Sequence, residues 1–256
     1  GDRSGTFNIS TAAAFVAAGA GARVAKHGNR SVSSRSGSAD VLEALGVAID
    51  LTVLRMGEVL DEAGIVFMFA PTMHPAMRHV GPVRREIAIP TVMNLVGPLA
   101  NPARAGRQVI GVADPARLEL IAGALHLLGT EHALIVHGSP GMDEISPLGP
   151  TTVIEVRGKT ITRWTLDPSA FGFTGLHRED LAGDGPQENA ALVERVLGGG
   201  GAPAAEAAVV LNAAGAIYVG GGARTFTAAM DVARAAMAGR AGLAALKRLR
   251  AAAPKT

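Results

Sequence analysis

Two glycine-rich loops in this sequence combine the residue types that bind phosphate groups. The first covers residues 1–11, and the second covers residues 26–38. Glycines let the backbone approach a ligand closely, while hydroxyl groups and the N–H groups at the start of a helix favour anionic oxygens. The second loop also carries three cationic side chains and five serines, which is enough to hold several phosphate oxygens at once. This chemistry indicates a phosphorylated ligand.

Each loop also has a plainer interpretation that the residues leave open. The first is compatible with an ordinary N-cap loop, and the second with a solvated surface loop. Residues 26–38, however, follow an expected strand and precede an expected helix. Because ligands of α/β sheets bind at the carboxyl ends of strands, this position favours the binding interpretation for the second loop.

A pair of adjacent carboxylates, Asp143 and Glu144, lies on a loop rich in glycine and proline after another expected strand. Magnesium prefers oxygen ligands and is often held by one or two carboxylates together with substrate phosphates. Taken alone, the pair is better explained as a solvated acidic turn. The two candidate phosphate loops favour a metal site, because their ligand would need a cation.

A fourth group of residues lies between positions 74 and 102. Arg84 or Arg85 could bind a carboxylate through two parallel hydrogen bonds, and His74 could line an aromatic substrate or act as a base. Without further information these residues favour a plainer interpretation, in which the arginines lie on the surface and a turn is built from proline and asparagine.

The elements that must position these loops alternate between helical and strand-like patterns, which predicts an α/β fold with mainly parallel strands. Unbroken apolar runs predict buried strands at 65–70 and 133–136, and a short strand is expected at 23–26. Residues 152–156 and 160–166 predict a β-hairpin. Helices are expected at 12–22, 38–45, 52–63, 187–197, 203–219, 225–238 and 240–252, and Asp114-Pro115 marks another helix start.

The composition narrows the class of protein. Of 256 residues, 48% are hydrophobic and 18% charged, which excludes disorder as a description of the whole chain. Cysteine is absent, so no disulfide or thiolate chemistry is expected and a cytoplasmic location fits. The 24 basic and 22 acidic residues nearly balance, so the charge does not indicate nucleic-acid binding. The uncharged stretch 207–223 is too short and too rich in alanine and glycine to predict a membrane span.

Taken together, these motifs resemble the anthranilate phosphoribosyltransferase family. The run Lys26-His27-Gly28-Asn29-Arg30-Ser31-Val32-Ser33-Ser34 is highly specific, and Gly1-Asp2 with Thr6-Phe7-Asn8-Ile9-Ser10-Thr11 precedes it. Residues 74–77, 94–102 and 143–144 follow in the family's order and spacing, so the resemblance covers essentially the whole chain. The resemblance implies the large domain that this family shares with nucleoside phosphorylases, an α/β fold with a mostly parallel sheet flanked by helices.

The resemblance implies transfer of phosphoribose from phosphoribosyl pyrophosphate (PRPP) to the amino group of anthranilate with release of pyrophosphate, a step of tryptophan biosynthesis. The implied PRPP site consists of Gly1, Asp2, Thr6, Asn8, Ile9, Ser10, Thr11, Lys26, His27, Gly28, Asn29, Arg30, Ser31, Val32, Ser33, Ser34 and Ser38. The implied anthranilate contacts are Gly1, Asn29, Arg84, His74 and Pro98, and the implied Mg²⁺ ligands are Ser10, Asp143 and Glu144. His27, Lys26 and Arg84 are the candidate catalytic residues, although no general base is required; if one acts, His27 is the candidate.

The resemblance also carries expectations about domains and assembly. This chain begins at the last glycine of the family's Gly-Thr-Gly-Gly-Asp run, so residues 1–256 are expected to correspond to the large α/β domain, with the small N-terminal helical domain absent from this chain. A homodimer is implied for the intact enzyme. Arg3, Pro140 and Met142 depart from the family's usual loops.

Three other functions remain open at this point. A nucleoside phosphorylase of the same fold would use phosphate as its nucleophile, and a fragment could bind PRPP without catalysing transfer. A non-catalytic relative that binds nucleic acid would have a basic stripe and lack the acidic pair. The nearly balanced charge and the presence of Asp143 and Glu144 argue against that third function.

Overall fold

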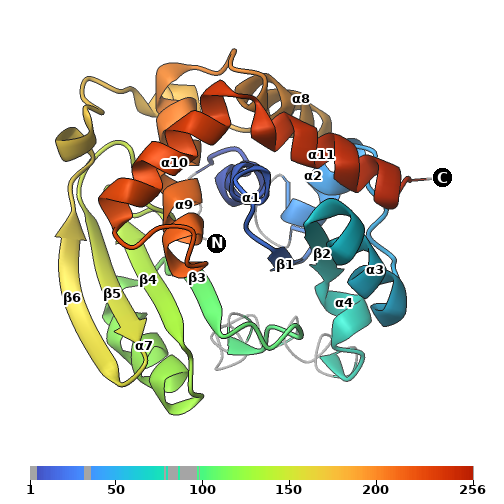
Figure 1. Cartoon of the computed structure of the whole chain (residues 1–256), viewed down its shortest axis with the longest axis horizontal. Helices are drawn as coiled ribbons and strands as arrows, with labels where there is room; N and C mark the ends of the chain where they lie inside the picture. The colour runs from blue at the N-terminus through green and yellow to red at the C-terminus, as the bar shows by residue number, and fades with distance from the viewer. Residues whose placement is uncertain are drawn as a thin grey trace.

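The computed structural model describes residues 5–31, 36–77, 79, 86, 97 and 99–255. Helices and strands alternate along this part of the chain, and the strands form two sheets (Figure 1). The predicted α/β architecture, with parallel strand pairs flanked by helices, is confirmed.

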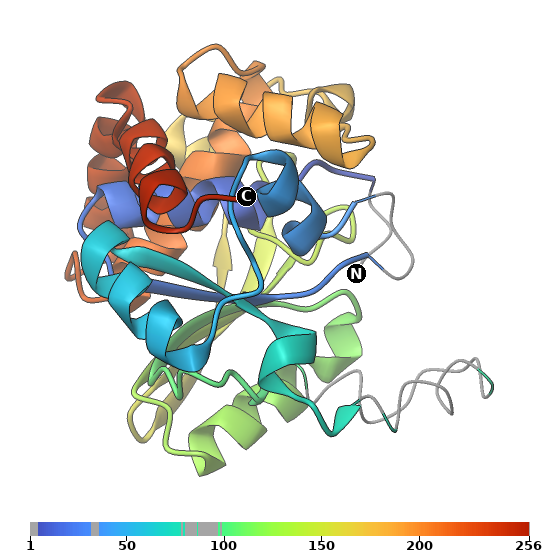
Figure 2. The same cartoon turned by 90° about the vertical axis from the view of Figure 1, so that its right-hand side faces the viewer.

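The N-terminal third of the chain builds the smaller sheet and the helices around it. Its elements are α1 (Ile9–Gly19), β1 (Val24–Gly28), α2 (Ser38–Ala44), α3 (Val53–Ala63), β2 (Ile65–Phe69) and α4 (Ala70–Met73). Strands β1 and β2 are parallel, with Lys26 opposite Phe67 and Gly28 opposite Phe69. Helix α1 lies directly against this pair (Figure 2). The N-terminus of α1 and the carboxyl end of β1 therefore come to the same side of the molecule.

The second sheet has four strands in the order β3-β4-β5-β6. Its elements, with the helix that follows β3, are β3 (Arg107–Gly111), α7 (Leu118–Leu127), β4 (His132–Gly138), β5 (Thr151–Arg157) and β6 (Thr160–Leu166). The β3–β4 pair is parallel, whereas β4–β5 and the predicted hairpin β5–β6 are antiparallel. The sheet is covered on both faces, because Ala133 and Ile135 of β4 pack in the cluster of α7 while Leu134 and Val136 belong to the main core.

The C-terminal third of the chain is helical and closes the core. After two short 3₁₀ turns, Pro168–Phe171 and Arg178–Leu181, the helices are α8 (Pro186–Leu197), α9 (Pro203–Val219), α10 (Phe226–Ala238) and α11 (Ala241–Ala252). Helix α9 is buried over nearly its whole length, as its run of small apolar residues predicts, and it packs on α1 (Figure 1). No helix of the described residues is long and apolar enough to cross a membrane.

Most predicted elements exist, with shifts at their ends. Helix α1 begins at Ile9, three residues before the expected start at 12, because the carbonyl of Asn8 already accepts the N–H of Ala12. Strand β3 was not predicted, since Arg-Gln-Val-Ile-Gly contains too short an apolar run. The helix expected after Asp114 begins as a 3₁₀ turn, Pro115–Arg117, before α7.

Candidate active site

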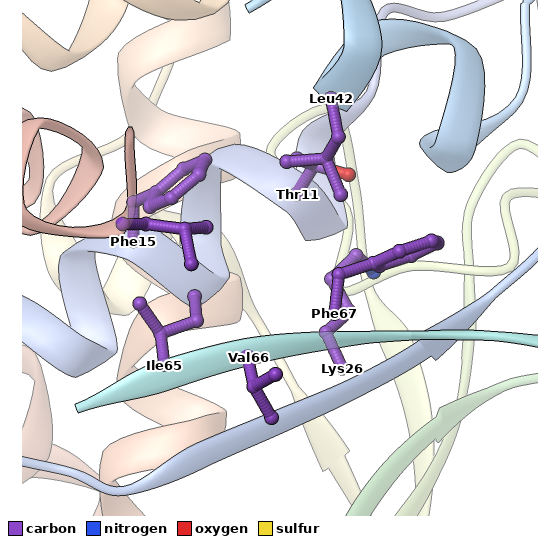
Figure 3. A pocket seen from close by; sticks show the side chains of 8 residues that line it. Thr11, Phe15, Lys26, Leu42, Ile65, Val66 and Phe67 are labelled. Carbon is purple, nitrogen blue, oxygen red and sulfur yellow. The ribbon is translucent and has the colours of Figure 1, made fainter. Parts of the chain in front are cut away.

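Lys26 joins the two glycine-rich loops. Its amine donates a hydrogen bond of 3.1 Å to the hydroxyl of Ser10, the second residue of α1. The aliphatic part of the side chain packs beside Phe67, beneath Leu42 and Thr11 (Figure 3). Burial lowers the pKa of Lys26, and the nearby carboxylate of Glu144 opposes that shift. A cationic group, a hydroxyl group and a carboxylate from three distant segments thus share one site.

The loop after β4 carries Asp143 and Glu144 and is called the acidic loop below. It reaches this site because β3 and β4 both end in glycine. A Cβ atom on Gly111, at the end of β3, would lie 1.6 Å from the carbonyl oxygen of Asp143. A Cβ atom on Gly138, at the end of β4, would lie 2.5 Å from the carbonyl oxygen of Glu144. Only glycine leaves room for the loop to fold over both strand ends at these distances. The acidic pair therefore lies at the carboxyl edge of the parallel strands, where α/β proteins bind ligands.

Two histidines face each other beside Lys26. The rings of His27 and His74 meet edge to face, with 5.1 Å between their centroids. In each ring Nε2 is buried and has no hydrogen-bond partner among the described residues. Burial, then His74 and then Lys26, lowers the pKa of His27, so its imidazole is neutral at pH 7. The pair offers ring nitrogens that can donate to or accept from a ligand.

Arg30 organises the second loop through carboxylates. Its guanidinium donates to Asp40 at 2.9 Å and to Glu43, and it lies over the ring of Phe69. Hydrogen bonds to Glu43 and then to Asp40 raise the pKa of Arg30. Asp40 in turn accepts the N–H groups of Ser31 at 3.1 Å and of Gly37 at 3.0 Å. These contacts fix both ends of the loop segment between β1 and α2.

Comparison with known proteins places these features in a family. Residues 1–244 match the family model described as "Glycosyl transferase family, a/b domain". Anthranilate phosphoribosyltransferases of a Roseiflexus species and of Thermomicrobium roseum are 52% and 51% identical to the chain, over 97% and 98% of its length and 73% and 72% of theirs.

Solved structures of anthranilate phosphoribosyltransferases also superpose closely on this chain. The anthranilate phosphoribosyltransferase of Thermus thermophilus superposes with a TM-score of 0.92 at 45% identity, over 98% of this chain and 75% of that one. The Saccharomyces cerevisiae enzyme, in complex with PRPP and Mg, gives 0.87 at 29% identity, over 98% of this chain and 71% of that one. The chain belongs to the anthranilate phosphoribosyltransferase family. The family resemblance seen in the sequence is thereby confirmed, and with it the prediction of an enzyme of the glycosyltransferase class.

The structure places Lys26 beside Ser10 and Glu144, and His27 beside His74, and it describes many of the residues that the family resemblance implied for the site. The described ones are Thr6, Asn8, Ile9, Ser10, Thr11, Lys26, His27, Gly28, Asn29, Arg30, Ser31, Ser38, His74, Asp143 and Glu144. The others lie outside the described residues: Gly1, Asp2, Val32, Ser33, Ser34, Arg84 and Pro98. Two of the described residues are buried, because Ile9 and the hydroxyl of Thr11 lie in the core.

Asn189 on α8 is a contributor that the sequence did not reveal. Its amide donates to the side-chain oxygen of Asn8 at 3.2 Å and also bonds both backbone groups of Asp184. Beside it, the N–H of Phe7 donates to the carbonyl of Leu181 at 2.9 Å. The first loop of this phosphoribosyltransferase is therefore held by residues about 180 positions away, and no local motif signals such a contact.

Proposed function

We propose that this chain carries out its family's reaction at the carboxyl ends of β1 and β4. Phosphoribose is transferred from PRPP to the amino group of anthranilate, and pyrophosphate is released. The observation that supports this location most strongly is the hydrogen bond from Lys26 to Ser10 beside Glu144, which gathers groups of opposite charge where a phosphorylated substrate and its cation would meet.

The phosphate groups of PRPP are proposed to bind between the N-terminus of α1 and the loop after β1. Ser10 lies exposed in the first turn of an eleven-residue helix, and the positive end of the helix dipole favours anionic oxygens there. Lys26 adds a positive charge held in a fixed place by its packing. Ser31 and Ser38, at the two ends of the loop that Arg30 organises, would add hydroxyl and backbone N–H groups.

The donor set at this edge fits Mg²⁺. No group of three His, Cys, Asp or Glu side chains within the described residues could hold a metal alone. Two carboxylates and a hydroxyl suit a cation that completes its shell with water and substrate phosphates, as Mg²⁺ does. Asp143, Glu144 and Ser10 are the proposed ligands. When bound, the ion neutralises charge on the departing pyrophosphate.

The anthranilate side of the reaction is assigned to His27, His74 and Asn29, with Arg84 and Pro98 by the family's pattern. The amine of anthranilate is already a nucleophile, so positioning it against C1 of the ribose is the main requirement. The bond from C1 to pyrophosphate breaks as the bond from nitrogen to C1 forms, and the amine then gives up a proton. Because the imidazole of His27 is neutral, its unpartnered Nε2 is able to accept that proton.

Replacing the acidic pair tests this assignment. The double variant Asp143→Asn, Glu144→Gln should lose turnover by about a hundredfold or more, since stabilisation of the leaving group is worth several kcal/mol. Formation of phosphoribosyl anthranilate from PRPP and anthranilate is the measurement, with Mg²⁺ and with excess EDTA. Excess EDTA should abolish turnover by the parent protein in the same way.

The control is Glu58→Gln, which removes a carboxylate from the exposed face of α3 and should leave turnover unchanged. Substantial activity in the double variant, or in EDTA, would remove the metal assignment. Cleavage of a nucleoside by inorganic phosphate, without anthranilate turnover, would instead identify a nucleoside phosphorylase.

A further inference from the structure

A buried asparagine on α9, Asn212, makes side-chain hydrogen bonds to the backbone of the acidic loop. The side-chain oxygen of Asn212 accepts the N–H of Ile145 at 2.9 Å, and its amide donates to the carbonyl of the same residue at 2.8 Å. The amide also donates to the carbonyl of Ala208, one turn back in the helix, at 2.9 Å. Asn212 is 5% exposed and Ile145 is fully buried, so these bonds are shielded from water.

These hydrogen bonds constrain the backbone of the neighbouring residue, Glu144. The N–H of Ile145 belongs to the peptide group that joins it to Glu144, so holding that N–H fixes the plane from which Glu144 projects. The glycines that end β3 and β4, Gly111 and Gly138, also lie close against the backbone of the pair. Ser146, which follows, donates its N–H to the hydroxyl of Thr151 at 3.0 Å. The backbone around the two carboxylates is therefore held by Asn212 of α9, by the ends of β3 and β4, and by Thr151.

The position of Asn212 in its helix argues for a specific role. Its neighbours on α9 are small or apolar, and helix propensity favours alanine or leucine over asparagine. A buried side-chain amide is unfavourable unless its hydrogen bonds are made. Here the bonds that reach beyond the helix all go to Ile145.

We infer that Asn212 is a positioning residue that sets the carboxylates of Asp143 and Glu144 against the Mg²⁺ and pyrophosphate of the bound substrate. The inference rests on the proposed function of that pair. Asn212 touches neither substrate nor metal, and it acts through the backbone of Ile145. Losing such an outer contact typically weakens metal binding by roughly 10–100-fold.

Two variants and a matched control test this role. Asn212→Ala removes all three bonds, whereas Asn212→Ser can bond the carbonyl of Ala208 as helical serines do and still releases Ile145. Should Asn212→Ala fail to fold, Asn212→Ser carries the test. The control, Tyr218→Phe on the same helix, loses a partly buried hydrogen bond of 2.8 Å to Glu155, a residue of β5 that pairs with the first half of β4 rather than with the loop after it.

The first measurement needs no catalysis. Binding of Mn²⁺ in the presence of pyrophosphate, followed by electron paramagnetic resonance, should weaken about tenfold or more in both Asn212 variants and stay within twofold in Tyr218→Phe. In turnover assays the Mg²⁺ concentration for half-maximal rate should rise, the KM for anthranilate should hold, and excess Mg²⁺ should restore most of kcat.

The outcomes separate the inference from the function on which it rests. Unchanged Mn²⁺ binding in a folded Asn212 variant, or equal weakening in Tyr218→Phe, would overturn the positioning role while leaving the proposed function in place. Absence of Mn²⁺ binding by the parent protein with pyrophosphate would overturn the metal assignment and this inference with it.

Discussion

Lys26 and Arg30 lie four residues apart, yet their surroundings give them different tasks. Lys26 is half-buried as a residue, and its amine is bonded to Ser10 and close to Glu144. The side chain of Arg30 is 47% exposed and already paired with Asp40 and Glu43. Because the guanidinium of Arg30 already donates to two carboxylates of the protein, it is less available to bind a phosphate group. Lys26 is therefore the stronger candidate to bind the charged phosphates of the substrate, whereas Arg30 is the stronger candidate to order the loop between β1 and α2.

Single variants should separate these two tasks. Lys26→Met should weaken PRPP binding by roughly 10–100-fold, the worth of a hydrogen bond to a charged group, with an unchanged or higher melting temperature because a desolvated cation is removed. Arg30→Met should weaken binding less and lower the melting temperature slightly, since exposed ion pairs contribute about 0–1 kcal/mol each. Calorimetric titration with PRPP and thermal melting provide the two readouts. Similar affinity losses in both variants would show that Arg30 contacts the substrate directly.

Among the elements, β4 and β5 carry a second polar cluster far from the acidic loop. Glu155 accepts hydrogen bonds from His132 at 2.9 Å, Tyr218 at 2.8 Å and Trp164 at 3.0 Å. Burial alone would raise the pKa of Glu155, but these bonds, led by that from His132, outweigh it and hold the pKa below its ordinary value of 4.5. The cluster ties α9 to the antiparallel part of the second sheet.

The lowered pKa predicts how this cluster responds to acid. Because the folded state binds the Glu155 proton less tightly than the unfolded state, the stabilisation is fully present above about pH 4.5 and is lost as pH falls through the folded pKa. Glu155→Gln should lower the free energy of unfolding by about 1–3 kcal/mol at pH 7, and the difference from the parent should shrink below pH 4.5. Urea unfolding at several pH values, followed by the fluorescence of Trp164, measures this. A difference independent of pH would contradict the ionised state assigned to Glu155.

The sequence predicted elements better than contacts. The apolar runs of β2 and β4 and the stop at Gly64 depend on local pattern, and both strands and the end of α3 appear where expected. Strand β3 gave no such signal, because only two of its five residues, Val109 and Ile110, are apolar beyond glycine. The residue types that suggest phosphate binding by the loops were readable from the sequence. Their supports were not: Asn189 acts across 181 positions and Asn212 across 67, distances over which only the folded chain defines neighbours.

On the scale of the whole molecule, α1 connects the site to the helical core. Its first turn carries Ser10, and its length packs against α9, α10 and α11 (Figure 1). The approach of α11 is close, because a Cβ atom on Gly19 would lie 2.4 Å from the backbone carbon of Ala241. The contact at the end of α1 therefore helps to fix the helix that presents Ser10 to the substrate.

Two glycine-to-alanine variants in helices distinguish this packing from helix propensity. Gly57 on α3 is exposed, and a Cβ atom there would meet nothing within 4 Å, so Gly57→Ala should stabilise by about 0.5–1 kcal/mol. Gly19→Ala, at the last residue of α1, must displace the backbone of α11, and overpacking of this kind costs about 1–3 kcal/mol. Thermal melting should show opposite shifts, by about 2–4 °C for each kcal/mol in a chain of this size. If Gly19→Ala raised the melting temperature as Gly57→Ala does, α11 would be free to move away from α1, and the close contact would not constrain the helix that carries Ser10.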